Sequence, residues 1–174
     1  MHFDVQGPFD LYRTSAKLID NTAEARRFYW EWVTDSVPGL DDACGCYIFT
    51  INTSNGALPW YIGKAERQSF RKECLSAHKI NHYNNAIAGR TGTPCLFFLP
   101  QLTRTGKYRK PTTSKRRAIS ELESLLIGMA ITRNPGLLNA RGTRWYQQMT
   151  VDGLINSRTA RKGPAKELSK ILNL

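Results

Sequence analysis

The sequence predicts an α+β fold with a small antiparallel sheet of three strands. Two segments rich in β-forming residues flank a turn signal, and a third such segment follows later in the chain. Beyond them lies a long stretch whose apolar residues recur at helical spacing. The chain has 174 residues, which suits one domain with short extensions and a core that needs no disulfide or metal for support.

The first predicted element is a helix over residues 14–36. Thr14 or Ser15 could cap its amino end, and Pro38-Gly39 would break the chain after it. Its apolar residues are Ala16, Leu18, Ile19, Ala23, Phe28, Trp30 and Val33. We expect this helix to form an N-terminal helical extension over residues 1–43.

A β-hairpin is predicted next, with strands over residues 46–51 and 60–62. Between them lies Asn55-Gly56, a pair that readily takes the positive φ angles of a tight turn. The connecting loop is expected to exceed two residues, which leaves the turn type open. Residues 94–99 are expected to form a third, buried strand.

Helices are predicted over residues 66–81 and 114–132. The apolar stripe of the second comprises Ala118, Ile119, Leu122, Leu125, Leu126 and Met129, and Asn134-Pro135-Gly136 ends the helix. A short basic helix is expected near residues 164–172, within a basic C-terminal extension over 141–174.

The charge of the chain indicates its class of partner. Lys and Arg total 25 against 14 acidic residues, a net charge of +11, which favours a polyanion such as nucleic acid. Residues 104–117 concentrate this charge, and we expect seven of their side chains to contact a phosphate backbone. They are Arg104, Lys107, Arg109, Lys110, Lys115, Arg116 and Arg117.

The chain lacks the roughly 18-residue apolar run that a membrane span needs. Its first residues also lack the basic and then apolar pattern of a secretion signal. The sequence therefore predicts a cytoplasmic protein with no membrane partner. Its oligomeric state is left open.

Four cysteines are too few for a disulfide scaffold at this length, and free buried thiols are expected at Cys44, Cys46, Cys74 and Cys95. A zinc site is the alternative. Cys74, His78 and His82 follow one another at helical spacing, and Cys44 or Cys46 could complete the ligand set.

Two tripeptides carry a family resemblance. Gly45-Cys46-Tyr47 and Tyr61-Ile62-Gly63 resemble the paired elements of the GIY-YIG nucleases, with Cys46 in place of the usual Ile. Thirteen residues separate the two tyrosines, and Lys64-Ala65 follows the second element. The resemblance implies a small sheet flanked by helices and a nuclease core over residues 44–140.

Later residues match the family in order. Arg71 lies ten residues after Tyr61, Glu123 lies in Leu-Glu-x-x-Leu-Ile, and Asn139 follows a turn that contains Pro135. One anchor departs, because Leu75 stands where the family has His or Tyr. If residues 66–81 form one helix, His78 shares a face with Arg71 and His82 and could take that role.

The resemblance implies a metal-dependent DNA endonuclease that leaves 5′-phosphate and 3′-hydroxyl ends. Glu123 would bind Mg²⁺ or Mn²⁺, and Arg71 would hold the scissile phosphate. Tyr47 or Tyr61 would orient or deprotonate the attacking water with help from Lys64. Asn139 would hold the helix of Glu123 or a water.

Alternatives remain at several points. Glu121 is a second candidate for the metal ligand, but Glu123 has more apolar helical neighbours and matches the family pattern. Tyr47 and Tyr61 could simply pack in a core. The chain could also be a non-catalytic nucleic-acid-binding protein on the same fold, or a basic structural protein without a site.

Overall fold

The computed structural model describes residues 1–139, 150–154 and 157–171. Its centre is a four-stranded antiparallel sheet in the order β1-β4-β2-β3. The strands are β1 (Gln6–Asp10), β2 (Gly45–Thr53), β3 (Gly56–Ala65) and β4 (Thr93–Pro100). The α+β class is confirmed, whereas the expected number of three strands is wrong. In the described part of the chain, no helix is both long and apolar enough to cross a membrane.

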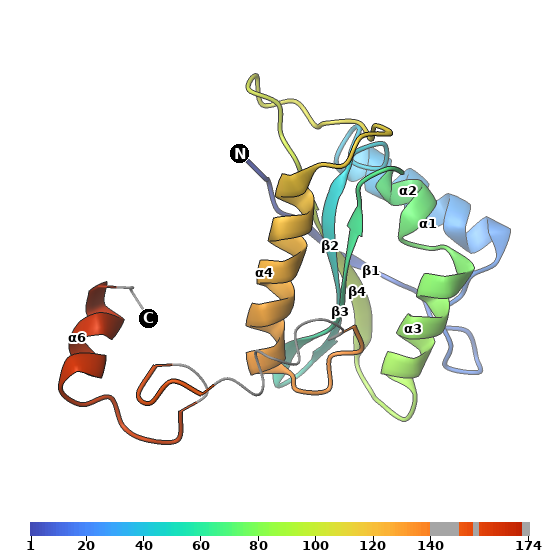
Figure 1. The fold of residues 1–174 in the computed structure, drawn as a ribbon. Helices are drawn as coiled ribbons and strands as arrows, with labels where there is room; N and C mark the ends of the chain where they lie inside the picture. Colours follow the sequence, from blue (N-terminus) through green and yellow to red (C-terminus); the bar gives the residue numbers. More distant parts are fainter. Residues whose placement is uncertain (140–149, 155–156, 172–174) are drawn as a thin grey trace.

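Helices cover both faces of the sheet. The helices of the described chain are α1 (Ala23–Ser36), α2 (Phe70–Glu73), α3 (Ala77–Ile87), α4 (Arg117–Arg133) and α6 (Pro164–Ile171), of which α6 lies away from the sheet in Figure 1. In Figure 1, α4 lies along one face of the sheet, and α1, α2 and α3 lie on the other. The division of the chain at residues 43 and 140 stays a prediction, and most of the junction after 140 lies outside the described residues.

The additional strand, β1, lies at one edge of the sheet and pairs with β4. It contains Gly7 and Pro8, two residues that normally argue against a strand. The edge position tolerates Pro8, because its nitrogen need not donate to a neighbouring strand. Gly7 has a φ of +120°, and a side chain there would press against the carbonyl oxygen of Leu96 on β4. Because of these two residues, the strand could not be predicted from the sequence pattern.

The hairpin of β2 and β3 is longer than predicted. Thr53 pairs with Gly56, so only two residues, Ser54 and Asn55, connect the strands. The expectation of a longer loop is wrong. Gly56 has a φ of +104°, whereas Asn55 does not have a positive φ. A local shift in register follows Phe49, and from there the pairing continues to the turn, where Thr53 ends β2 and Gly56 begins β3.

The N-terminal helix begins later than predicted. Thr22, rather than Thr14 or Ser15, caps α1, and its side-chain oxygen accepts a hydrogen bond from the backbone N–H of Ala25 at 3.1 Å. Residues 14–18 instead form a turn, closed by a bridge between Arg13 and Ile19, in which Lys17 has a φ of +62°. Ile19 at this bridge is buried although it is not helical. Counting apolar residues therefore placed the start of the helix too early.

The predicted helix over 66–81 is two helices, because the chain breaks between Glu73 and Ala77. Leu75, in the break, is buried in the main core. Arg71 and His78 therefore do not share one continuous helical face, and that expectation is wrong.

The predicted stripe of α4 is partly wrong as well. Ile127 and Ile131 are buried against the sheet, whereas Leu125 and Met129 are exposed. The predicted helix near 164–172 corresponds to α6, although Leu172 lies outside the described residues.

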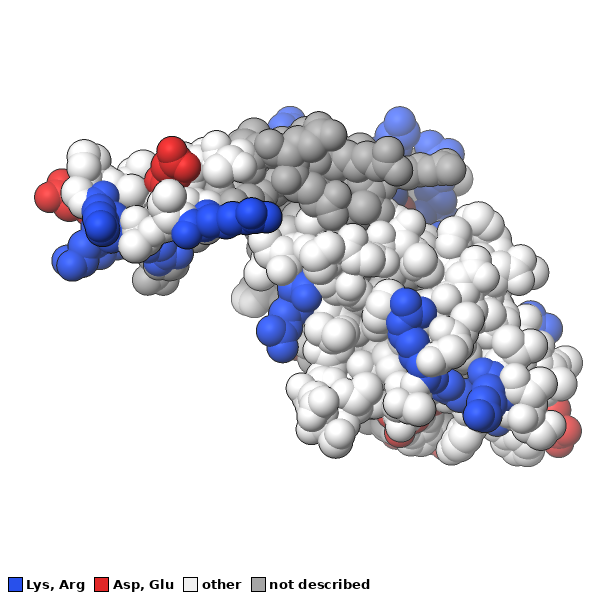
Figure 2. Space-filling model, turned by 90° about the horizontal axis from the view of Figure 1, so that it is seen from below, with Lys and Arg blue, Asp and Glu red and all other residues white. Residues whose placement is uncertain are grey.

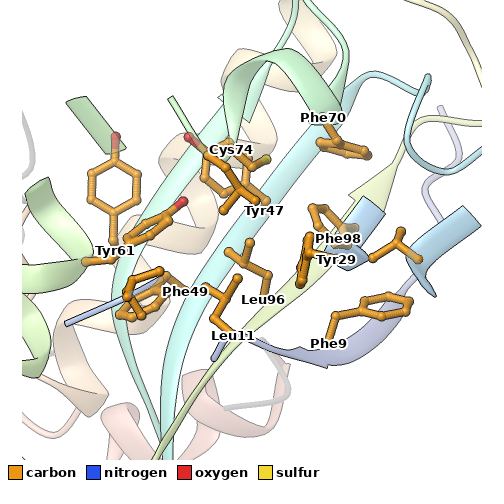
Figure 3. Close-up of a cluster of buried hydrophobic side chains, with 14 of the residues drawn as sticks. Phe9, Leu11, Tyr29, Tyr47, Phe49, Tyr61, Phe70, Cys74, Leu96 and Phe98 are labelled. Atoms are coloured by element: carbon orange, nitrogen blue, oxygen red, sulfur yellow. The ribbon is translucent and has the colours of Figure 1, made fainter. Parts of the chain in front are cut away.

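Alternation along the strands gives each face its own core. Tyr47, Phe49 and Phe98 lie on the face toward α1 and α3, within a large cluster rich in aromatic residues (Figure 3). Cys46 and Ile62 lie on the opposite face, in smaller clusters with residues of α4. The side chain of each hairpin residue therefore packs on one of the two faces of the sheet.

Gly63 makes room for Tyr47. The two residues are direct partners across the β2–β3 ladder. A Cβ atom on Gly63 would overlap the Cζ and Oη atoms of the Tyr47 ring. The glycine of the second tripeptide is thus required by the tyrosine of the first.

We expect Gly63→Ala to lower the free energy of unfolding by about 1–3 kcal/mol, because the added methyl group overfills this contact. Chemical denaturation of the single variants and of Gly63→Ala combined with Tyr47→Ala measures the coupling. In the Tyr47→Ala background the cost of the added methyl should nearly vanish. An equal cost in both backgrounds would show that the Tyr47 ring is not what excludes a side chain at Gly63.

Candidate active site

Tyr47 and Tyr61 lie on the same face of the hairpin, with their ring centroids 6.3 Å apart. Tyr47 is fully buried, and its hydroxyl has no hydrogen-bond partner among the described residues. Burial raises the pKa of Tyr47 well above its usual value of 10, and the neighbouring Tyr83 and Cys74 raise it further. Tyr47 is therefore a neutral packing residue and a poor general base.

Tyr61 has a cation beside its hydroxyl. The Lys79 Nζ atom on α3 donates a hydrogen bond to Tyr61 Oη at 2.8 Å and forms an ion pair with Glu73 at 3.3 Å. Burial lowers the pKa of Lys79, but its contacts with Tyr61 and Glu73 outweigh that effect and raise the pKa overall. Lys79 thus remains charged and takes the place beside tyrosine that the sequence had assigned to Lys64.

Sequence reasoning missed Lys79, because it is 18 residues from Tyr61 and belongs to none of the motif positions. One signal could have suggested it. Lys79 lies directly after His78, on a segment already expected to contribute to the site. Only the fold of α3 against β3 shows which side chain of that segment reaches the tyrosine.

Lys64 and Glu123 meet on the opposite face of the sheet. Lys64 Nζ lies 3.0 Å from Glu123 Oε2 and donates a hydrogen bond to the Ser120 hydroxyl at 3.1 Å. Both charged side chains are partly buried. Glu121, by contrast, is exposed and pairs with Arg117 one turn earlier on α4 at 2.6 Å. The two carboxylates thus differ in surroundings, and the choice of Glu123 over Glu121 as the metal ligand stays a prediction.

Asn139 binds the backbone of β3. Its Oδ1 atom accepts a hydrogen bond from the Ile62 N–H at 3.1 Å, and its Nδ2 atom donates to the Ile62 carbonyl. Strand β3 is at the edge of the sheet, so these backbone groups point away from β2. Asn139 therefore holds the middle residue of the second tripeptide rather than a side chain of α4.

Arg71 lies apart from both groups. Its Nε atom donates to Asp41 Oδ2 at 2.9 Å, and its Nη2 atom donates to the Thr34 hydroxyl at 3.3 Å. The guanidinium also lies over the Trp30 ring, 5.8 Å from its centroid. These contacts join α2 to α1 and to the loop before β2. The contacts of Arg71 thus join elements of the fold, and its guanidinium is bound to Asp41 and Thr34 rather than to Tyr61 or Glu123.

The two histidines of α3 are neighbours. The Nε2 atoms of His78 and His82 are 3.1 Å apart. The His82 ring stacks on Tyr61 with a centroid distance of 5.1 Å. His82, rather than His78, therefore contacts the tyrosine of the second tripeptide, and Leu75 is a core residue.

The candidate residues form two groups around one edge strand. Tyr61, Lys79 and His82 lie on one side of β3, and Lys64 and Glu123 lie on the other. A small ligand in either layer would contact one group. A ligand that reached both groups would have to extend past β3, whose outer edge is bound at Pro59, Trp60 and Ile62 by Asn134, Leu138 and Asn139.

The basic segment 104–117 divides into two kinds of residue. Arg116 braces a loop, donating to the Lys110 carbonyl at 2.8 Å, to Gln101 and to the Cys44 sulfur. Arg109 donates to the Leu102 carbonyl at 3.2 Å. These two are partly buried and serve the fold.

The other five cations of the segment are exposed. Lys110 and Arg117 pair with Asp42 and Glu121, acids outside the segment. Arg104, Lys107 and Lys115 are the exposed members for which no ion pair is recorded in the described chain. Figure 2, a view from the end of the molecule away from this segment, shows that basic side chains also occur there, dispersed among uncharged ones.

The cysteines are free and buried, as expected. Burial raises the pKa of each thiol, that of Cys95 to about 12. Cys46 donates to the Ile119 carbonyl on the α4 side, whereas Cys74 lies in the core of the other face. Among the described residues, no group of three or more His, Cys, Asp and Glu side chains could hold a metal ion. This arrangement gives the cysteine-containing zinc alternative no support.

Comparison of the chain with protein-family models, with curated proteins and with solved structures finds no significant match. The likeness to GIY-YIG nucleases therefore stays a resemblance carried by the residues named above. Function is inferred from those residues and their geometry.

Proposed function

We propose that this chain is a metal-dependent endonuclease that hydrolyses DNA to 5′-phosphate and 3′-hydroxyl ends. The observation that carries the proposal is the convergence of three motif positions on β3. Glu123 pairs with Lys64, and Asn139 binds the backbone of Ile62, although 59 and 77 residues separate these partners (123 − 64 and 139 − 62). The net charge of +11 supports a polyanionic substrate.

The chemistry of Glu123 is compatible with a divalent ion. One carboxylate completed by water is a ligand set that Mg²⁺ or Mn²⁺ accepts, since these ions prefer oxygen and Mg²⁺ keeps much of its hydration. The carboxylate is partly exposed, and its ion pair with Lys64 uses Oε2. When bound, the ion would stabilise negative charge that develops on the phosphate oxygens. Lys64 would add a second positive charge on the same side of β3.

The residues on the other side of β3 would handle the proton of the attacking water. Tyr61 Oη accepts its hydrogen bond from the charged Lys79, which fixes the direction of the hydroxyl group. Glu73 holds Lys79 in place. Tyr47 lies behind Tyr61 and supports its ring. We therefore assign the base to Tyr61 and a packing role to Tyr47.

A second candidate function is nucleic-acid binding without catalysis. Two observations favour it. The sheet separates Tyr61 from Glu123, and Arg71 is engaged by Asp41 rather than presented to a substrate. Both functions predict binding to DNA, so cleavage by matched variants distinguishes them.

We expect Glu123→Gln to reduce single-turnover cleavage of plasmid DNA in Mg²⁺ by about 10²-fold or more, because a bound metal contributes several kcal/mol to the transition state. Glu121→Gln is the matched control, two residues away on the same helix. Its loss affects only an exposed pair with Arg117 and should leave the rate unchanged.

Binding of the same DNA in Ca²⁺, and the thermal unfolding of both variants, complete this test. Equal rates for Glu123→Gln and Glu121→Gln would remove Glu123 from the site. If the wild-type chain binds DNA but cleaves none with Mg²⁺ or Mn²⁺, the non-catalytic alternative is correct.

We expect Tyr61→Phe to lower the cleavage rate strongly and Tyr47→Phe to leave it within about threefold, because general-base groups contribute about 10²–10⁴-fold. The Tyr47→Phe protein should be as stable as the wild type, since the buried Tyr47 hydroxyl has no hydrogen-bond partner in the described part of the chain. Lys79→Met should resemble Tyr61→Phe, and Lys79→Arg should recover part of the rate. A large loss from Tyr47→Phe alone would reverse the assignment of the two tyrosines.

We expect Arg104, Lys107 and Lys115, when changed together to Ala, to weaken binding of all DNA sequences alike. If each cation meets one phosphate, the slope of log K against log salt should flatten by up to about 2.7, or about 0.9 per contact. Replacing Lys17, Arg26 and Arg27, exposed residues before and within α1, removes the same charge as a control. Equal slopes for the two triple variants would show that Arg104, Lys107 and Lys115 make no phosphate contacts beyond those of any exposed cation.

A further inference from the structure

Two imidazole rings on α3 are arranged as a pair. His78 and His82 are four residues apart, so their side chains leave the same side of the helix. Their Nε2 atoms approach to 3.1 Å, and the ring planes are nearly perpendicular, at 82°. Each ring therefore directs its outer nitrogen toward the same small region of space.

The separation fits a shared ion. With a metal–nitrogen distance of about 2.05 Å, two donors 3.1 Å apart subtend an angle of about 98° at the metal. That angle lies between the roughly 90° of neighbouring ligands in octahedral or square-planar geometry and the roughly 109° of a tetrahedron. An ion could thus bind between the two nitrogens with little movement of either helix turn.

We propose that His78 and His82 form a binding site for a late first-row transition ion of the Ni²⁺ and Cu²⁺ type. Imidazole nitrogens suit these ions, whereas Mg²⁺ and Ca²⁺ take oxygen ligands. The affinity should follow the usual order, in which Ni²⁺ binds more tightly than Co²⁺ and Co²⁺ more tightly than Mn²⁺. The site is distinct from Glu123, which lies on the opposite side of the sheet.

The surroundings hold one ring and leave the other accessible. His82 is partly buried and stacks on Tyr61, 5.1 Å between centroids and 24° between planes, which fixes its orientation. His78 is exposed, so an ion can approach from solvent. No third His, Cys, Asp or Glu in the described residues completes a ligand group here, so water would fill the remaining positions. The site is therefore open and exchangeable.

Isothermal titration of the full chain with NiCl₂ tests the site, and His2 provides the control because it is the third histidine of the chain. His78→Ala and His82→Ala should each weaken Ni²⁺ binding by roughly tenfold or more, and His2→Ala should leave it unchanged. His78→Gln, at an exposed position, repeats the test with a smaller change in volume. Bound Ni²⁺ should also broaden the NMR signals of the Tyr61 ring, because His82 lies against it.

Three outcomes would overturn the proposal. They are an affinity that falls only in His2→Ala, an affinity unchanged in the His78→Ala/His82→Ala double variant, and no Ni²⁺ binding by the folded wild-type chain. None of these measurements depends on cleavage of DNA. The metal site and the proposed nuclease function can therefore fail or succeed separately.

Discussion

The register of β2 against β3 is the constraint on which the rest of the structure depends. Because side chains alternate along a strand, the pairing of Tyr47 with Gly63 assigns every neighbouring residue to one face. Tyr61 is sent toward α3, where Lys79 and His82 contact it. Lys64 is sent toward α4, where it meets Glu123. A slip of one residue would exchange the two layers and would also force the Tyr47 ring against a position with a side chain.

The elements that local pattern governs were predictable. The strands over 46–51 and 94–99 and the long helix over 114–132 appear close to their expected positions, because β-forming residues and helical spacing act within each segment. Prediction from local sequence pattern was wrong where contacts between distant segments determine the secondary structure. Strand β1 forms despite Gly7 and Pro8 because β4 offers it an edge. The helix over 66–81 is broken where Leu75 enters the core.

The candidate site was also predictable only in part. Motif order predicted that Lys64, Glu123 and Asn139 belong to one site. In the structure Lys64 pairs with Glu123 and not with a tyrosine, and Asn139 binds the backbone of Ile62 and not the helix of Glu123. Motif order did not anticipate that Asp41 engages Arg71, because a contact over 30 residues depends on how α2 packs beside α1. It also missed Lys79, since the reach of a lysine on α3 is fixed by the packing of that helix. Spacing identifies candidates, and packing decides which of them meet.

The contact of Asn139 with Ile62 also affects how readily molecules of this protein could associate through the sheet edge. An edge strand offers a row of unpaired backbone groups on which a strand of another molecule can assemble. On β3, the amide of Asn139 already occupies the N–H and the C=O of Ile62. An incoming strand would have to displace this side chain before it could extend the ladder past that residue. Asn139, with Leu138 bound to the carbonyl of Trp60, therefore hinders polymerisation through this edge of the sheet.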